Sequence, residues 1–65
     1  MFYRITIETI NQSIYKIDWL ARNEKIAKHE IYRYLQKNSF PEKIAAIKAE
    51  SMPDIGYYPD LTQIN

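Results

Sequence analysis

The side chains best suited to chemistry in this sequence are basic and aromatic, and they recur at helical spacing between residues 25 and 36. They are Lys25, Lys28, His29, Tyr32, Arg33 and Gln36. Tyrosine and arginine are enriched at protein interfaces, and an aromatic ring among cations can also stack on a nucleic-acid base. The same pattern is typical of a solvated helix face, on which Glu24 and Lys28 would form an ion pair. Three interpretations therefore stay open: a solvated face, a site for an acidic protein, and a site for nucleic acid.

A second set of candidate contact residues lies near the end of the sequence. Residues 52–65 contain two of the three prolines, the only glycine and no basic residue, which disfavours a helix or a central strand. We expect an irregular tail, and its candidate contact residues are Tyr57, Tyr58, Leu61 and Ile64. They could dock on a partner as an extended segment. Alternatively, Ile55 or Tyr57 packs on the domain edge, or the acidic tail folds over the basic helix face.

Most catalytic constellations are excluded by residue type. The chain has one histidine, no cysteine and one glycine, which leaves no thiolate nucleophile, no cysteine-based metal site and no glycine-rich phosphate loop. His29 and Arg33 lie one helical turn apart, where a metal site would need a second ligand such as histidine or glutamate. We therefore expect neither enzymatic activity nor a cofactor or metal.

Length and composition predict one small domain. A chain of 65 residues buries only about 60% of the surface that it exposes when unfolded, so its stability is marginal or depends on a partner. The net charge is +1, but residues 22–48 hold seven basic and three acidic groups, and residues 49–65 hold three acidic groups and no basic one. No apolar run reaches the roughly 20 residues that span a membrane, and the first residues do not resemble a signal peptide. Since cysteine is also absent, we expect a soluble, cytoplasmic protein.

Two runs of alternating polarity, residues 2–10 and 14–21, predict a β-hairpin. Within each run a set of large apolar residues falls on odd numbers and alternates with polar residues, which is the pattern of a strand with one buried face. The two sets are Tyr3, Ile5 and Ile7, and Tyr15, Ile17 and Trp19. Paired residues must therefore have numbers with an even sum. A sum of 24 sets Ile7 opposite Ile17 and leaves Asn11-Gln12-Ser13 as a three-residue loop, in which one residue must tolerate left-handed geometry. The outer face then carries balanced charge, which argues against nucleic-acid binding by the sheet.

A helix should follow the hairpin. Asn23 can cap it, and Glu24 suits its positively polarised first turn. The helix should end near Lys37 or Asn38, because Asn-Ser-Phe-Pro follows. One stripe is apolar at the spacing of a core-facing surface. The stripe consists of Ala27, Ile31, Tyr34 and Leu35. We expect it to lie across the apolar face of the hairpin.

Residues 42–50 are open to two interpretations. Ser39-Phe40-Pro41-Glu42 resembles a helix capping box and good helix formers follow, which would give a ββαα order. A two-stranded sheet is marginal alone, however, and a third strand would give it the width to bury the helix. We therefore predict a strand with Ala45, Ile47 and Ala49 facing the core. It should lie beside the first strand and parallel to it, reached by a right-handed crossover.

The predicted protein is an α+β domain of ββαβ order over residues 1–51, with an irregular tail over residues 52–65. The layout, the helix start Ala-Arg-Asn-Glu-Lys-Ile-Ala and the helix end Leu-Gln-Lys-Asn resemble the small ββαβ bacteriophage proteins that inhibit host enzymes. A short inhibitor of bacterial RNA polymerase belongs to this group. The resemblance covers residues 2–51 and includes no shared functional motif. It implies a phage-encoded protein that binds and disables a host enzyme.

Binding is the function that the residues and this resemblance predict. We expect a small protein-binding module, encoded by a phage or mobile element, that occludes a surface of a larger host protein in the host cytoplasm. Tyrosine and arginine would serve as its anchors. One alternative is a nucleic-acid-binding protein that uses the basic helix face. Another is a small accessory subunit or homodimer that completes its sheet through the edge of the hairpin.

Overall fold

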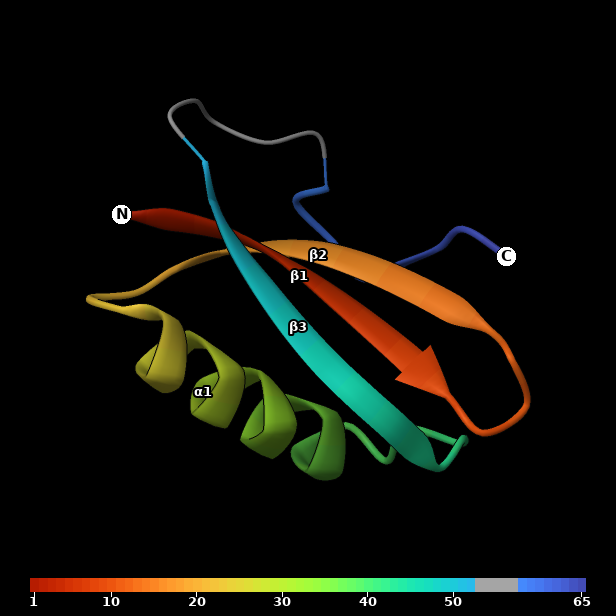
Figure 1. The fold of residues 1–65 in the computed structure, drawn as a ribbon. Coiled ribbons are helices and arrows are strands. Elements are labelled where there is room, and N and C mark those ends of the chain that lie inside the picture. The colour runs from red at the N-terminus through yellow and green to blue at the C-terminus, as the bar shows by residue number, and fades with distance from the viewer. Residues whose placement is uncertain (53–57) are drawn as a thin grey trace.

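The computed structural model describes residues 1–52 and 58–65, which form a four-stranded sheet with one helix against it (Figure 1). The chain order is β1 (Phe2–Thr9), β2 (Ile14–Leu20), α1 (Glu24–Lys37), β3 (Ile44–Met52) and β4 (Thr62–Gln63). In space the strands are ordered β3-β1-β2-β4, and every neighbouring pair is antiparallel. The predicted α+β class and the ββαβ order of the first four elements are confirmed.

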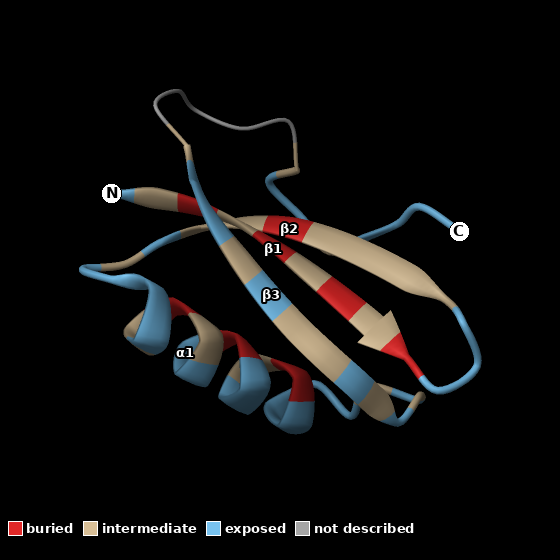
Figure 2. Ribbon diagram, viewed as in Figure 1, coloured by how far each residue is buried: buried red, intermediate tan, exposed pale blue. Residues whose placement is uncertain are grey.

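The core lies between α1 and one face of the sheet, and among the strands β1 contributes most to it (Figure 2). Every second residue of β1 is buried. The core cluster consists of Tyr3, Ile5, Ile7, Ile17, Ala27, Ile31 and Leu35. Burying one large aliphatic side chain contributes about 1.5–3 kcal/mol relative to leaving it exposed. The alternation in the hairpin and the stripe on the helix therefore explain why these two elements pack together.

The hairpin has the predicted faces but a different register. Ile5 pairs with Ile17 and Ile7 pairs with Tyr15, so the numbers of paired residues sum to 22 and not to 24. Both registers keep the odd-numbered residues on the core face, because both sums are even. Periodicity therefore fixes the faces but does not choose between the two registers.

The turn of the hairpin explains the difference in register. Thr9 donates its backbone N–H to the Ser13 carbonyl at 3.0 Å, so the three-residue loop consists of residues 10–12. Gln12 has the left-handed conformation (φ 67°) that a loop of this length requires. Ile10 has the residue type of a strand but lies in the turn, where 59% of its surface is exposed. The predicted loop has the right length and is displaced by one residue.

The helix agrees with its prediction at both ends. Asn23 is the N-cap, and its side-chain oxygen accepts a backbone N–H of the first turn at 2.9 Å, which satisfies a donor that no helical carbonyl reaches. Lys37 is the last helical residue and Asn38 is the C-cap. Three residues of the predicted stripe are buried, and the fourth, Tyr34, is half-buried with its ring centre 5.5 Å from that of Trp19.

β3 is antiparallel to β1, so the predicted parallel pairing is wrong. Phe2 lies opposite Met52 at one end of this pair, and Thr9 lies opposite Ile44 at the other. β2 ends at the end of the sheet where β1 begins, and the 14-residue α1, about 21 Å long, carries the chain back along the sheet. β3 therefore starts beside the end of β1. It is parallel to β2, and β1 lies between them.

A bulge near the start of β3 changes which residues face the core. The β1–β3 register shifts by one residue after Glu8, so that Ala45 is an extra residue without a partner in β1. Ala45 is exposed, contrary to the prediction, and Ile44 packs against the core cluster in its place. Ile47 and Ala49 pack against the core cluster as predicted. The strict alternation assumed for this segment fails at the bulge.

The last described segment, predicted to be irregular, pairs with the outer edge of β2. β4 lies opposite Tyr15 and Lys16 of β2. Further along β2, Asp18 donates its backbone N–H to the Tyr58 carbonyl at 2.8 Å. Residues 58–65 therefore run along the sheet edge and not over the basic face of α1. Nothing in the sequence indicated this pairing, because it uses backbone groups, which carry no signal in the residue types.

Candidate functional site

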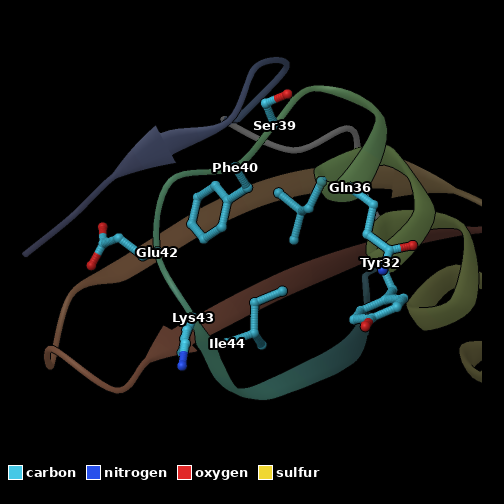
Figure 3. A pocket seen from close by; sticks show the side chains of 8 residues that line it. Tyr32, Gln36, Ser39, Phe40, Glu42, Lys43 and Ile44 are labelled. Carbon is cyan, nitrogen blue, oxygen red and sulfur yellow. The ribbon is translucent and has the colours of Figure 1, made fainter.

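An open groove of about 510 Å³ lies between the last turns of α1 and the loop that leads into β3 (Figure 3). Its lining residues include Tyr32, Leu35, Phe40, Glu42, Lys43 and Ile44. Leu35 is 1% exposed, whereas Tyr32 is 46% exposed. The groove thus combines packed apolar side chains, an exposed tyrosine ring and charged groups.

The end of α1 fixes the loop that forms one wall of the groove. Ser39 has a left-handed conformation (φ 55°). Its N–H donates to the Gln36 carbonyl at 3.2 Å, and the Phe40 N–H donates to the Leu35 carbonyl at 2.9 Å. These are the two hydrogen bonds of a Schellman motif, and the apolar residue that usually accompanies the motif is here Phe40. The Phe40 ring packs edge-on against Tyr15, with the ring centres 5.0 Å apart.

Glu42 ties the same loop to the hairpin. Its carboxylate accepts hydrogen bonds from the hydroxyl groups of Tyr15 and Thr9, the latter at 3.0 Å. The hydrogen bond from Tyr15 and, to a lesser degree, that from Thr9 hold the pKa of Glu42 below its ordinary value of 4.5. The same bond to Glu42 raises the pKa of Tyr15 above its ordinary value of 10.0. An ionised carboxylate and a neutral phenol therefore hold this wall in place at neutral pH.

The outward face of α1 beside the groove is basic. The helix contains four basic and two acidic residues, and one of the acidic residues, Glu30, accepts a hydrogen bond from the indole N–H of Trp19 at 3.0 Å. The expected pair of Glu24 and Lys28 is not formed, since the ion pairs of residues 1–52 and 58–65 both lie on the sheet. The predicted contact residues do share this face: Lys25, His29, Tyr32, Arg33 and Gln36 are exposed, and Lys28 is half-buried.

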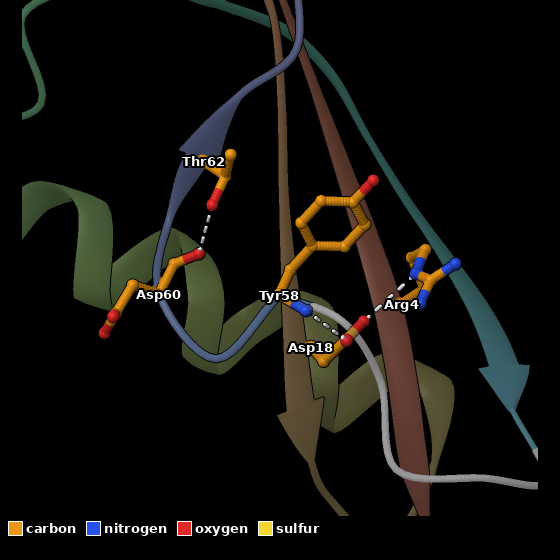
Figure 4. A network of polar contacts seen from close by, with 5 residues as sticks. All are labelled: Arg4, Asp18, Tyr58, Asp60 and Thr62. Atoms are coloured by element: carbon orange, nitrogen blue, oxygen red, sulfur yellow. Dashed lines mark hydrogen bonds and ion pairs between the residues drawn. The ribbon is translucent and has the colours of Figure 1, made fainter.

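On the sheet face away from the helix, Tyr58 completes a polar network (Figure 4). Nε of Arg4 donates to Oδ1 of Asp18 at 3.1 Å, and Oδ2 of Asp18 accepts the backbone N–H of Tyr58 at 2.9 Å. The guanidinium carbon of Arg4 lies 5.0 Å from the centre of the Tyr58 ring, which is a cation–π distance. The hydrogen bond to Asp18 raises the pKa of Arg4. This network attaches the C-terminal segment to the sheet.

The structure separates the two predicted sets of contact residues. The helix residues lie together beside the groove, whereas Tyr58 lies over Arg4 on the other face of the sheet. Leu61 packs against the core cluster. The predictions for Tyr57 and Ile55 fall outside the described residues. Of the tail candidates, Tyr58 and Leu61 therefore contact their own chain.

Sequence reasoning identified Tyr32 but missed the apolar side of the groove. Phe40 and Ile44 come from the loop after α1 and from the bulged start of β3, where neither helical nor strand periodicity applies. One signal was available, because the Phe-Pro pair directly after the helix end combines a large apolar side chain with a chain reversal.

The described residues define a small α+β domain with a four-stranded antiparallel sheet and an open groove at one end of its helix. Across residues 1–52 and 58–65, no group of three or more His, Cys, Asp or Glu side chains is placed to hold a metal ion. The helix found in this part of the chain is too short and too polar to cross a bilayer. The chain matches no known family model, no curated protein and no solved structure.

Proposed function

We propose that this chain is a small protein-binding module whose groove beside Tyr32 receives an acidic segment of a larger protein. The observation that carries the proposal is a tyrosine ring, 46% exposed, at an open hollow lined by Leu35, Phe40 and Ile44. Binding energy at protein interfaces is concentrated in aromatic and arginine side chains that enter or border such apolar pockets. Tyr32 is the anchor in this proposal.

The charges around the groove favour an acidic partner. Lys43 lines the groove, and Arg33 is exposed one residue beyond Tyr32 on α1. Among the described residues that line it, the one acidic residue, Glu42, already accepts hydrogen bonds from Tyr15 and Thr9. Opposite charges on two partners increase the rate of encounter and fix their relative register. The partner segment should therefore carry an apolar side chain for the groove, flanked by aspartate or glutamate.

The proposed mechanism is occlusion. A 65-residue domain that binds a functional surface of a larger protein prevents other ligands from reaching it and needs no chemistry of its own. The resemblance in layout to the small phage inhibitors supports a host protein as the partner and the host cytoplasm as the place of action. On this proposal the chain is encoded by a phage or another mobile element.

The proposal is tested by affinity capture from a nuclease-treated bacterial lysate with the tagged full chain. Three proteins are compared: the wild type, Tyr32→Ala, and Leu20→Ala as the control, since Leu20 is 62% exposed and lies on β2, away from the groove. One protein should be captured by the wild type and by Leu20→Ala. Its affinity for Tyr32→Ala, measured by calorimetry, should be lower by about 30-fold, as expected for a central interface anchor.

Two results would contradict this function. Capture that is equally strong with Tyr32→Ala would move the binding surface away from the groove. Material that is captured from an untreated lysate but not from the nuclease-treated one, with binding that weakens steeply as salt is raised, would assign nucleic-acid binding to the basic face of α1 instead.

A further inference from the structure

The two edges of the sheet differ. The edge formed by β2 is covered by β4 and by the hydrogen bond between Asp18 and Tyr58. At the other edge, β3 extends over nine residues and pairs only with β1 among the described residues. No residue of β3 is buried, whereas every second residue of β1, the strand that it pairs with, is buried (Figure 2). β3 is therefore a long edge strand that lacks a neighbour in the described part of the chain.

The residue types of β3 provide little protection against pairing with another strand. Natural edge strands are protected by proline, by short length, by bulges or by charged side chains. β3 contains no proline, and its bulge lies at Ala45 near one end. Its two charged residues, Lys48 and Glu50, have opposite signs and lie two positions apart on the same face. In an antiparallel pair, this spacing makes a strand complementary to a copy of itself.

We infer that two copies of this chain associate through antiparallel pairing of their β3 strands about a two-fold axis at Ala49. This inference goes beyond the proposed function and does not depend on it. Both core faces must lie on the same side of the continuous sheet, so even-numbered residues face even-numbered residues. Centring the pair on Ala49 then sets Lys48 of each copy opposite Glu50 of the other, with the small Ala49 side chains meeting on the axis.

The neighbouring alignments are disfavoured by charge. Centring the pair on Lys48 would set this lysine against its own copy, and centring it on Glu50 would do the same for the glutamate. Like charges directly opposite one another destabilise a sheet, and opposite charges stabilise it. The charge pattern therefore selects the alignment centred on Ala49 over the alignments centred on its two sequence neighbours.

The charges already on the sheet continue this pattern across the axis. Asp18 pairs with Arg4, and Arg4 in turn lies opposite Glu50. Lys48 of the second copy would lie next to Glu50, which gives a row of four side chains of alternating sign, from Asp18 of one copy to Lys48 of the other. Within one copy, Lys48 is engaged only in an exposed ion pair with Glu8 at 2.8 Å, with 68% and 37% of the two side chains exposed. Such a pair contributes little, so Lys48 is free to reorient toward a second copy.

The test uses charge reversal in the full chain, measured by sedimentation equilibrium over a range of concentrations at low salt. The wild type should show a monomer–dimer equilibrium. Lys48→Glu and Glu50→Lys should each weaken self-association by about tenfold or more, since both intermolecular pairs become repulsive. An equimolar mixture of the two variants should form a heterodimer at least as stable as the wild-type dimer, because each Glu then faces a Lys. Lys25→Glu on α1 makes the same change of charge away from β3 and should leave the dimer unchanged.

The mixture distinguishes a loss of pairing from a loss of folding. A variant that had lost association because it folds poorly would stay defective in the mixture, whereas repulsion between identical strands is relieved there. The inference is overturned by a wild type that stays monomeric over the whole range, by single variants that dimerise as the wild type does, or by a mixture that stays monomeric. Should a variant fail to fold, hydrogen exchange on the wild type decides the question. The relevant amides are those of β3 whose N–H groups point away from β1. If their protection from exchange rises with protein concentration, the pairing is supported, and if they exchange freely at every concentration, it is overturned.

Discussion

Arg4 and Asp18 form an ion pair across β1 and β2, with Nε of Arg4 3.1 Å from Oδ1 of Asp18, and the second oxygen of the same carboxylate holds the backbone of Tyr58 at 2.9 Å. One side chain thus joins two strands and the C-terminal segment. The Asp18 side chain is 5% exposed, so water competes little for its oxygens. This carboxylate therefore adds a side-chain contact to the backbone pairing that holds residues 58–65 on the sheet edge.

Replacing this carboxylate should release the C-terminal segment while the rest of the fold persists. In Asp18→Ala, the backbone amides from residue 58 onward should exchange faster with solvent and the segment should be cleaved faster by protease, because the side-chain acceptor for Tyr58 is lost. Asp18→Asn retains an acceptor without the charge and should lie between this variant and the wild type. Asp60→Ala is the control, since this exposed residue bonds locally through its backbone carbonyl. Equal cleavage rates in all four proteins would contradict this role.

Stability should depend on pH through the pair of Glu42 and Tyr15. The folded-state pKa of Glu42 is lowered from 4.5, so its contribution is present above the unfolded-state value and is lost as pH falls through the folded-state value. The pKa of Tyr15 is raised from 10.0, so its contribution is full below that value and is lost as pH rises through the folded-state value. Urea unfolding should therefore show a plateau at neutral pH that falls at both ends.

Two variants separate the two ends of this profile. Glu42→Gln should flatten the acidic decrease of the free energy of unfolding, because no carboxylate remains to be protonated at this position. Tyr15→Phe should flatten the alkaline decrease. An acidic decrease in Glu42→Gln as steep as in the wild type would show that other carboxylates govern acid stability.

The core contact between α1 and the sheet should dominate the stability of the fold. Ile31 is fully buried at the centre of the helix stripe. Ile31→Ala should lower the free energy of unfolding by about 2–5 kcal/mol, which is comparable to the whole stability of a domain of this size. Ile64→Ala, at a residue 47% exposed, should change it by less than about 0.5 kcal/mol. Chemical unfolding followed by circular dichroism measures both, and similar losses in the two variants would contradict the core described above.

Glycine at the two left-handed positions should stabilise the chain. Gln12 and Ser39 have φ values of 67° and 55°, where a side chain costs about 1–2 kcal/mol and glycine has no such penalty. Gln12→Gly and Ser39→Gly should each raise the free energy of unfolding by about 0.5–1 kcal/mol, since the greater freedom of glycine in the unfolded chain offsets part of the gain. The double variant should show the sum, because the two turns are separate. The neighbouring substitution Asn11→Gly is the control and should not stabilise.

The faces of the strands and the ends of the helix were predictable because they depend on local chemistry. The odd-numbered apolar residues of the hairpin and the cap at Asn23 are each determined by side chains near them in the sequence. The hairpin register was not predictable in this way, because Ile10 has the residue type of a strand but lies in the turn. The direction of β3 depends on where α1 delivers the chain, which is a property of the whole topology.

The candidate site was predictable in part for the same reason. Tyr32 follows from helical spacing alone, since its place on the outward face is set by α1 itself. The opposite wall depends on the Schellman turn at Ser39 and on the bulge at Ala45. Both are departures from regular structure that bring Phe40 and Ile44 toward the helix, and no periodic pattern encodes them.

The position of β1 between β2 and β3 also affects how the chain folds as it is synthesised. β1 is synthesised before both of the strands that flank it, and the second of them, β3, is complete only when Met52 has been added. A two-stranded hairpin is marginal alone, so the buried residues of β1 lack a finished core while most of the chain is being translated. At about 5–20 residues per second, this interval lasts seconds. We therefore expect the chain to fold in one late step, with its most deeply buried strand exposed to chaperones until then.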